Sequence, residues 1–115
     1  MKLVLTEEEQ FLKDTAKNFA EERCPISHFR SLRDNNDPNL WDENIWKEMT
    51  ALGWPGILIP EEYGGIGMGF LELCVIAEEL GRGIAPVPFS SSVYLATTAI
   101  LNSSNEEVKK EYLPK

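Results

Sequence analysis

The chain has 115 residues, with 19 acidic against 11 basic side chains, and its formal net charge is −8. This length suits one domain, which can bury a core without disulfide or metal staples. The acidic balance excludes the basic surface that binding to nucleic acid or to an anionic membrane requires, and no apolar run approaches the ~18 residues of a membrane span.

The first segment predicts a long helix. Thr6 and Glu9 have the spacing of a capping box, and the apolar residues that follow recur at helical intervals. This helix should end near Arg23, because Pro25 cannot continue it. A short second helix is expected over residues 26–33.

The next segment predicts a turn, a third helix and a buried linker. Residues 34–39, DNNDPN, are rich in turn formers. Asp42 can cap a helix that runs to Leu52, and Gly53 is placed to end it in a left-handed conformation. Residues 54–60, WPGILIP, are apolar but bounded by prolines, so we expect buried extended chain there and no sheet.

Residues 70–80 predict a helix that is apolar over most of its circumference and ends at Gly81. We expect Cys74 to be a small core residue, and Glu78 and Glu79 to form the polar strip of this helix. A helix that is apolar all round must be covered all round. Four or five short helices cover it badly, so another surface should pack here.

The last segments complete an all-α fold, an orthogonal or up-down bundle of about six helices. A proline-punctuated loop, GIAPVPF, covers residues 83–89. Serines 90–92 offer caps for a helix that continues to Leu101. Ser104 and Glu107 have capping-box spacing for a final helix.

The run GGIGMG over residues 64–69 invites comparison with phosphate-binding loops, whose backbone amides hold anions at a helix start. The spacing matches neither common pattern. A dinucleotide fingerprint starting at Gly65 needs a glycine where Phe70 stands, and a P-loop needs a Gly-Lys-Ser/Thr sequence. We interpret the run as a tight backbone turn where another segment approaches closely.

The sequence shows no self-contained active site, so we assign no catalytic residue. The adjacent acids at 61–62 resemble surface turn residues, and serines 90–92 have no base nearby. The single histidine, His28, is expected at the surface. With Cys24 and Cys74 far apart, no zinc-site spacing exists and no metal is expected. Two such cysteines fit a reducing, cytoplasmic setting.

The order of these segments resembles the N-terminal domain of flavin-dependent acyl-CoA dehydrogenases. The similarity covers essentially the whole chain. It is carried by LTEEEQFLKDTAKNFAEE, by WKEMTALGWPG, by IPEEYGG followed by GMGFLELCVIAEELGR, and by the ending SSNEEVKKEYLPK. Each piece alone is weakly specific, and their order makes the match.

The resemblance implies an oxidoreductase of fatty-acid metabolism. Such enzymes pass a hydride from the β-carbon of an acyl-CoA thioester to FAD, after a glutamate removes the α-proton. A middle β-domain and a C-terminal helical domain supply the base and most flavin contacts. Residues 1–115 then correspond to the N-terminal domain without those two domains, so no flavin-binding residue is assigned and the chain alone should be inactive and bind FAD weakly.

The resemblance also implies where the substrate would lie. By position, residues 86–99 resemble the loop and helix that wall the acyl cavity. The residues expected to line it are Pro88, Phe89, Ser91, Ser92, Leu95 and Ala96. The implied partners are the acyl-CoA substrate, the missing domains and, in the complete enzyme, further copies in a homo-oligomer.

Two alternatives stay open. One is a related flavoenzyme on the same scaffold, an acyl-CoA oxidase or a monooxygenase. The other is a stand-alone helical interaction module that pairs through its apolar helices. The acyl substrate, the electron acceptor and the oligomeric state are left open, as is the origin of the chain: a cloned domain, a truncated gene product or a proteolytic fragment.

Overall fold

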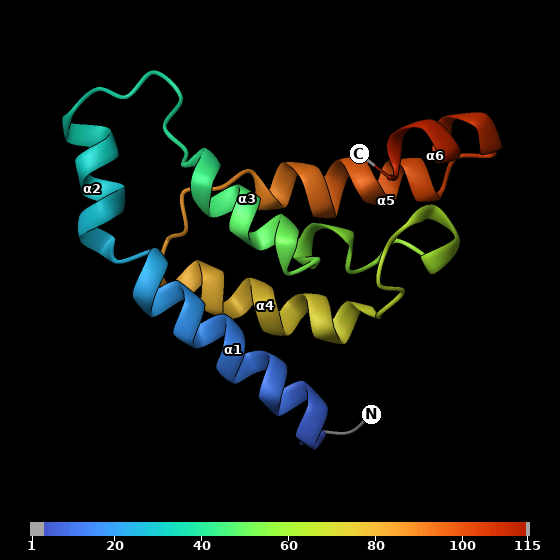
Figure 1. Cartoon of the computed structure of the whole chain (residues 1–115), viewed down its shortest axis with the longest axis horizontal. Helices are drawn as coiled ribbons and strands as arrows, with labels where there is room; N and C mark the ends of the chain where they lie inside the picture. Colours follow the sequence, from blue (N-terminus) through green and yellow to red (C-terminus); the bar gives the residue numbers. More distant parts are fainter. Residues whose placement is uncertain (1–3, 115) are drawn as a thin grey trace. The chain divides into compact units, whose positions relative to one another are not determined.

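The computed structural model describes residues 4–114, and within that range it contains six α-helices and no strand (Figure 1). The predicted all-α class is confirmed. The chain divides into two compact units. Unit 1 comprises the residues up to Asp42 together with Cys74–Val87, and unit 2 comprises Glu43–Leu73 together with the residues from Pro88 on.

Unit 1 begins with α1 (Glu7–Arg23), whose start is the capping box that the sequence predicts. The Glu9 N–H donates to Thr6 Oγ1 at 3.2 Å, and the Thr6 N–H donates to Glu9 Oε2 at 2.7 Å. These two bonds satisfy backbone donors that a helix start otherwise leaves free. The short helix α2 (Ile26–Asp34) follows Pro25, as expected.

Helix α4 (Phe70–Arg82) contributes its residues from Cys74 on to unit 1, where they pack against α1. Ala16 and Ala20 of α1 are buried, and their small side chains allow a close approach. A Cβ on Gly83 would lie 3.2 Å from the Cys24 carbonyl oxygen, so the glycine after α4 lets the chain pass tightly over the end of α1.

His28 differs from its expected place at the surface. Its side chain is only 30% exposed, and its Nε2 lies 2.8 Å from Asp42 Oδ2. The Asp42 N–H donates to the Pro86 carbonyl at 2.8 Å. His28 is therefore half-buried rather than fully exposed, and neighbours in sequence do not indicate this contact because the partner comes from 14 residues further along the chain.

Unit 2 starts with α3 (Glu43–Ala51), and Gly53 follows it with φ of 79°, the left-handed conformation that the sequence predicts. The expectation of extended chain over residues 54–60 is wrong. Residues Trp54–Gly56 form the 3-10 helix η1, and the Ile59 N–H donates to the Gly56 carbonyl. Pro55 in the first turn presets a helical φ, and an apolar pattern this short does not distinguish a compact turn from an extended strand.

The C-terminal part of unit 2 holds a π-helix, η3 (Ser90–Thr97), followed by α5 (Thr98–Leu101) and α6 (Glu106–Tyr112). Both predicted caps were wrong. No side chain caps η3, and Ser91 Oγ donates instead to the Pro88 carbonyl. Asn105, one residue after the predicted Ser104, caps α6 because its side-chain oxygen accepts from two backbone amides at once.

Helix α4 exposes part of its apolar surface, and two expectations about it were wrong. Cys74, expected in the core, is exposed, and Glu79, expected in a polar strip, is 3% exposed. The buried face instead follows Leu73, Ile76 and Leu80. At about 100° per residue, Cys74 falls on a different side of the helix from this face.

Candidate functional site

An open hollow of about 430 Å³ lies in unit 2. No charged side chain lines it, and its walls come from α3, the turns after it, η3, α5 and the end of α6. Ligand sites are typically concave and apolar with few polar groups. The lining residues are Trp46, Thr50, Gly53, Pro55, Gly56, Ile59, Gly64, Ser92, Ala96, Thr97, Ile100, Tyr112, Leu113 and Pro114.

The π-helix η3 places three of these residues on the hollow. In a π-helix each backbone bond reaches five residues along the chain, so side chains four and five apart lie on one side. Ser92, Ala96 and Thr97 have this spacing, and Thr97 Oγ1 donates to the Ser92 carbonyl at 2.9 Å. Val93 of η3 and Phe89, which precedes it, are buried in the core of unit 2.

The structure brings two of the six predicted acyl-lining residues, Ser92 and Ala96, to this hollow. The other four lie outside its walls. Phe89 is buried against Tyr94, with ring centroids 5.6 Å apart, and Leu95 is 70% exposed. Pro88 is half-buried and Ser91 is exposed. Contact of any of the six with a substrate stays a prediction.

Sequence reasoning missed most of the other walls of this hollow. Ile100 follows Ala96 by four residues, so helical periodicity could have predicted that it lines the same hollow. Trp46 and Thr50 come from α3, and Tyr112 comes from the end of α6, far away in sequence. No local pattern indicates that these segments share a hollow, because only tertiary packing brings them together.

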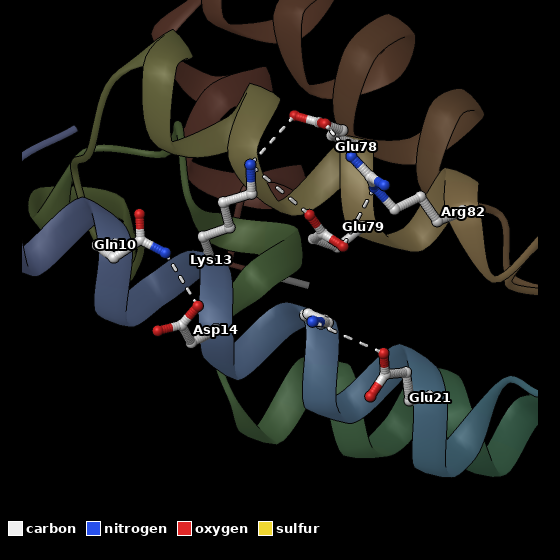
Figure 2. A network of polar contacts seen from close by, with 8 residues as sticks. Gln10, Lys13, Asp14, Glu21, Glu78, Glu79 and Arg82 are labelled. Carbon is white, nitrogen blue, oxygen red and sulfur yellow. Dashed lines mark hydrogen bonds and ion pairs between the residues drawn. The ribbon is translucent and has the colours of Figure 1, made fainter. Parts of the chain in front are cut away.

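Unit 1 holds a charge cluster between α1 and α4 (Figure 2). Lys13 Nζ lies 3.9 Å from carboxylate oxygens of both Glu78 and Glu79. Arg82 donates to Glu78 Oε1 at 2.7 Å and places Nε 3.4 Å from Glu79 Oε2. The hydrogen bond from Arg82, together with the nearby positive charge of Lys13, lowers the pKa of Glu78. This cluster ties the two helices together.

A second open hollow, of about 540 Å³, lies beside this cluster within unit 1. Its lining includes six charged residues, and each has a partner of opposite charge or a hydrogen bond within unit 1. A wall of paired charges suits an acyl chain poorly, because entry would strip water from those groups. The lining residues are Gln10, Lys13, Asp14, Lys17, Ala20, Glu21, Cys24, Pro25, Ile26, Glu79, Arg82 and Gly83.

The glycine-rich loop of unit 2 does not offer a phosphate cradle. Its backbone N–H groups from Gly64 to Met68 donate to carbonyls of the preceding turns, and the Gly69 N–H donates to Glu72 Oε2. A Cβ on Gly65 would lie 2.0 Å from the Ile59 carbonyl oxygen. The interpretation as a tight backbone turn is therefore confirmed, and these amides are not free to bind the diphosphate of a dinucleotide.

Over residues 4–114, no group of three or more His, Cys, Asp or Glu side chains is arranged to hold a metal ion. Among the helices described, none combines the length and the apolar character needed to cross a bilayer.

Comparison with known proteins gives one consistent match. Residues 6–115 match the family of the acyl-CoA dehydrogenase N-terminal domain. Mitochondrial isovaleryl-CoA dehydrogenase of Solanum tuberosum is 32% identical over 98% of this chain and 27% of its own length. Glutaryl-CoA dehydrogenase of Desulfococcus multivorans is 35% identical over 96% of this chain and 29% of its own length.

The structural comparison agrees. The structure of butyryl-CoA dehydrogenase from Megasphaera elsdenii matches with a TM-score of 0.77 and 26% identity, over 99% of this chain and 30% of that chain. The fold is that of a helical domain, and unit 2 carries an uncharged hollow. The chain belongs to the acyl-CoA dehydrogenase family, as its N-terminal domain, and it spans about a quarter of the length of the curated relatives it matches.

Proposed function

We propose that this chain is the N-terminal wall of the acyl-binding cavity in an FAD-dependent acyl-CoA dehydrogenase. The enzyme would desaturate an acyl-CoA thioester between its α- and β-carbons. The observation that carries this assignment is the uncharged hollow in unit 2, because it accepts an apolar chain without stripping water from charged groups. Membership of the acyl-CoA dehydrogenase family supports this reaction class.

The role of these residues in the reaction would be binding and exclusion of water. Ser92, Ala96 and Ile100 would contact the acyl group from one side of the hollow. FAD would accept the hydride when it is bound. The glycine-rich loop offers no cradle for its phosphates, because its backbone N–H groups are already bonded, and flavin binding and the catalytic base would belong to other domains of a longer flavoprotein.

The proposal also covers the cellular setting. Neither cysteine forms a disulfide, which fits a reducing compartment, and we infer the cytoplasm. Several relatives are named as mitochondrial enzymes. The mitochondrial matrix is also reducing, so it is the alternative compartment to test.

An NMR titration of the chain tests the acyl assignment. Hexanoyl-pantetheine, a thioester without the nucleotide of CoA, should shift the amide signals of Ser92, Ala96 and Ile100. Ala96→Trp should fill the hollow and abolish these shifts, whereas Ser91→Ala, on the exposed side of the same helix, should preserve them. Shifts that concentrate instead on the hollow of unit 1 would contradict the assignment.

A second function, a helical interaction module, is favoured by one observation. Phe70 is 67% exposed, Leu71 is 48% exposed and Leu95 is 70% exposed. An interaction module should cover such residues in one defined dimer, which sedimentation would detect. An acyl-CoA oxidase on the same scaffold would be distinguished by oxygen consumption of the whole flavoprotein.

A further inference from the structure

The hydroxyl of Ser92 is a polar group in the wall of the unit 2 hollow that the described part of the chain leaves unbonded. Ser92 lines the hollow and is half-buried. Among residues 4–114, its Oγ has no hydrogen-bond partner, whereas its backbone N–H and its carbonyl are both engaged. A serine side chain is one carbon and its hydroxyl, so a ligand that contacts this side chain also reaches the oxygen.

The usual internal partner of such a hydroxyl is already occupied here. Serine hydroxyls in helices commonly donate to the carbonyl four residues earlier, which for Ser92 is the carbonyl of Pro88. That carbonyl accepts from the Ser92 N–H at 3.0 Å and from Ser91 Oγ at 3.1 Å. A carbonyl oxygen has two lone pairs, so a third donor finds no acceptor site there.

The two threonines of the hollow differ from Ser92 because their hydroxyls donate to backbone carbonyls. Thr50 Oγ1 donates to the Trp46 carbonyl at 2.9 Å. Thr97 Oγ1 donates to the Ser92 carbonyl at the same distance. Each threonine oxygen can still accept a hydrogen bond. The hollow therefore presents a hydroxyl whose hydrogen is available, on Ser92, together with acceptor oxygens on α3 and η3.

A purely aliphatic chain matches these groups poorly. Solvent can bond to the Ser92 hydroxyl while the hollow is open to water. A bound chain displaces that solvent, and a ligand that cannot replace a displaced hydrogen bond loses affinity. A carboxylate would replace the bond but finds no cation in an uncharged wall, and a ketone can only accept. A neutral hydroxyl can accept from Ser92 and donate to a threonine oxygen.

We propose that Ser92 is the polar recognition point of the hollow, and that the acyl group bound there carries a hydroxyl. The hydroxyl lies beyond the β-carbon, because the α- and β-carbons are those that react. This substrate class rests on the proposed function, whereas recognition of a hydroxyl by Ser92 does not. Ser92 determines specificity in this assignment and takes no part in the transfer of the proton or the hydride.

The test compares matched thioesters in an NMR titration of the chain. 6-Hydroxyhexanoyl- and heptanoyl-pantetheine differ only in a hydroxyl against a methyl group at the chain end, and 8-hydroxyoctanoyl- and nonanoyl-pantetheine repeat the comparison at a greater depth. In at least one pair the hydroxylated member should bind more tightly, because a site that bonds a hydroxyl disfavours the analogue without it. Equal or tighter binding of the aliphatic member in both pairs would overturn the proposal.

Three variants assign the preference to Ser92. Ser92→Ala should reduce the ratio of the two Kd values about fivefold, which corresponds to roughly 1 kcal/mol for one hydrogen bond. Ser92→Thr keeps the hydroxyl and should keep the preference. Ser90→Ala removes a hydroxyl from an exposed residue of η3 outside the walls of the hollow, so it should leave the ratio unchanged. A Ser92→Ala chain with dispersed amide signals and the wild-type ratio would refute the assignment.

1-Butanol gives a measurement that does not depend on acyl recognition, because it presents a hydroxyl without a thioester. It should shift the amide signals of Ser92 and Thr97 in the wild-type chain, and Ser92→Ala should reduce the shift at Thr97 severalfold. Absence of these shifts in the wild type would contradict the proposal even if thioesters bind. If butanol responds and no thioester binds, the acyl assignment fails and Ser92 remains the recognition point for a hydroxyl-bearing ligand.

Discussion

At the scale of single residues, two glycines show how differently the same residue type acts in this chain. Gly65 stands where a Cβ would lie 2.0 Å from the Ile59 carbonyl oxygen, a backbone atom that cannot move aside cheaply. Gly81 lies inside α4, where a Cβ would meet nothing within 4 Å. The first is required by packing, and the second only adds flexibility to the unfolded chain.

Gly65→Ala should therefore destabilise the chain by about 1–3 kcal/mol or more, the usual cost of overpacking. Gly81→Ala should stabilise it by roughly 0.5–1 kcal/mol, the preference for alanine in a helix. Urea denaturation curves of both variants check this. Equal effects in the same direction would mean that the backbone around Gly65 relaxes freely.

At the scale of elements, α6 is attached to the 3-10 helix η2 (Glu61–Tyr63) by the hydrogen bond from Tyr63 Oη to the Glu106 carboxylate, so this attachment should depend on pH. The hydrogen bond from Tyr63, followed by that from Lys109, lowers the pKa of Glu106. A carboxyl group with a lowered pKa in the fold contributes stability that is present above its unfolded pKa and is lost as pH falls through its folded pKa.

The stability difference between wild type and Tyr63→Phe should thus be present at neutral pH and should shrink below about pH 4.3, the ordinary glutamate value. At the alkaline end, the phenol with its pKa raised to about 12 should ionise later than an ordinary tyrosine. Urea midpoints from neutral to acidic pH, with ultraviolet titration above pH 9, measure both. A constant difference down to low pH would exclude Glu106 as the partner that matters.

The elements also show where local patterns predict structure well. The capping box of α1 and the left-handed Gly53 depend on neighbours within a few residues, and the glycine run folds back onto the turns that precede it. All three predictions are confirmed. The serine caps and the extended reading of residues 54–60 failed. In those segments several local structures are compatible with the same residues, and packing chooses among them.

At the scale of the whole molecule, the two units leave apolar side chains at the surface of residues 4–114. Among them are Phe11, Phe70, Leu71 and Leu95. Exposed apolar patches beyond a few hundred Å² tend to be covered by other surfaces. This observation fits a domain that packs against other parts of a flavoprotein, and it also fits the interaction module.

The chain alone should therefore associate weakly and without a fixed stoichiometry, because exposed apolar side chains that pack against other domains in a larger flavoprotein would be left to contact any apolar surface. Sedimentation velocity over a range of concentrations should show a gradual rise in mean mass that Phe70→Ser with Leu71→Ser reduces. A single sharp dimer would support the interaction module.

With FAD, an acyl-CoA and a dye as electron acceptor, we expect the chain alone to show no turnover. Measurable dye reduction would contradict the assignment of the catalytic base to another domain.

The amino-acid sequence by itself determined the helical class, the positions of most helices and the family resemblance, because these depend on periodicity, caps and the order of motifs along the chain. Only the tertiary structure decided that Cys74 is exposed and that Glu79 is buried and paired with Lys13 and Arg82. It likewise decided that His28 contacts Asp42. It also decided which segments share the uncharged hollow. Periodicity states which face of a helix is apolar, but the partner that covers that face comes from distant residues whose approach no local pattern encodes.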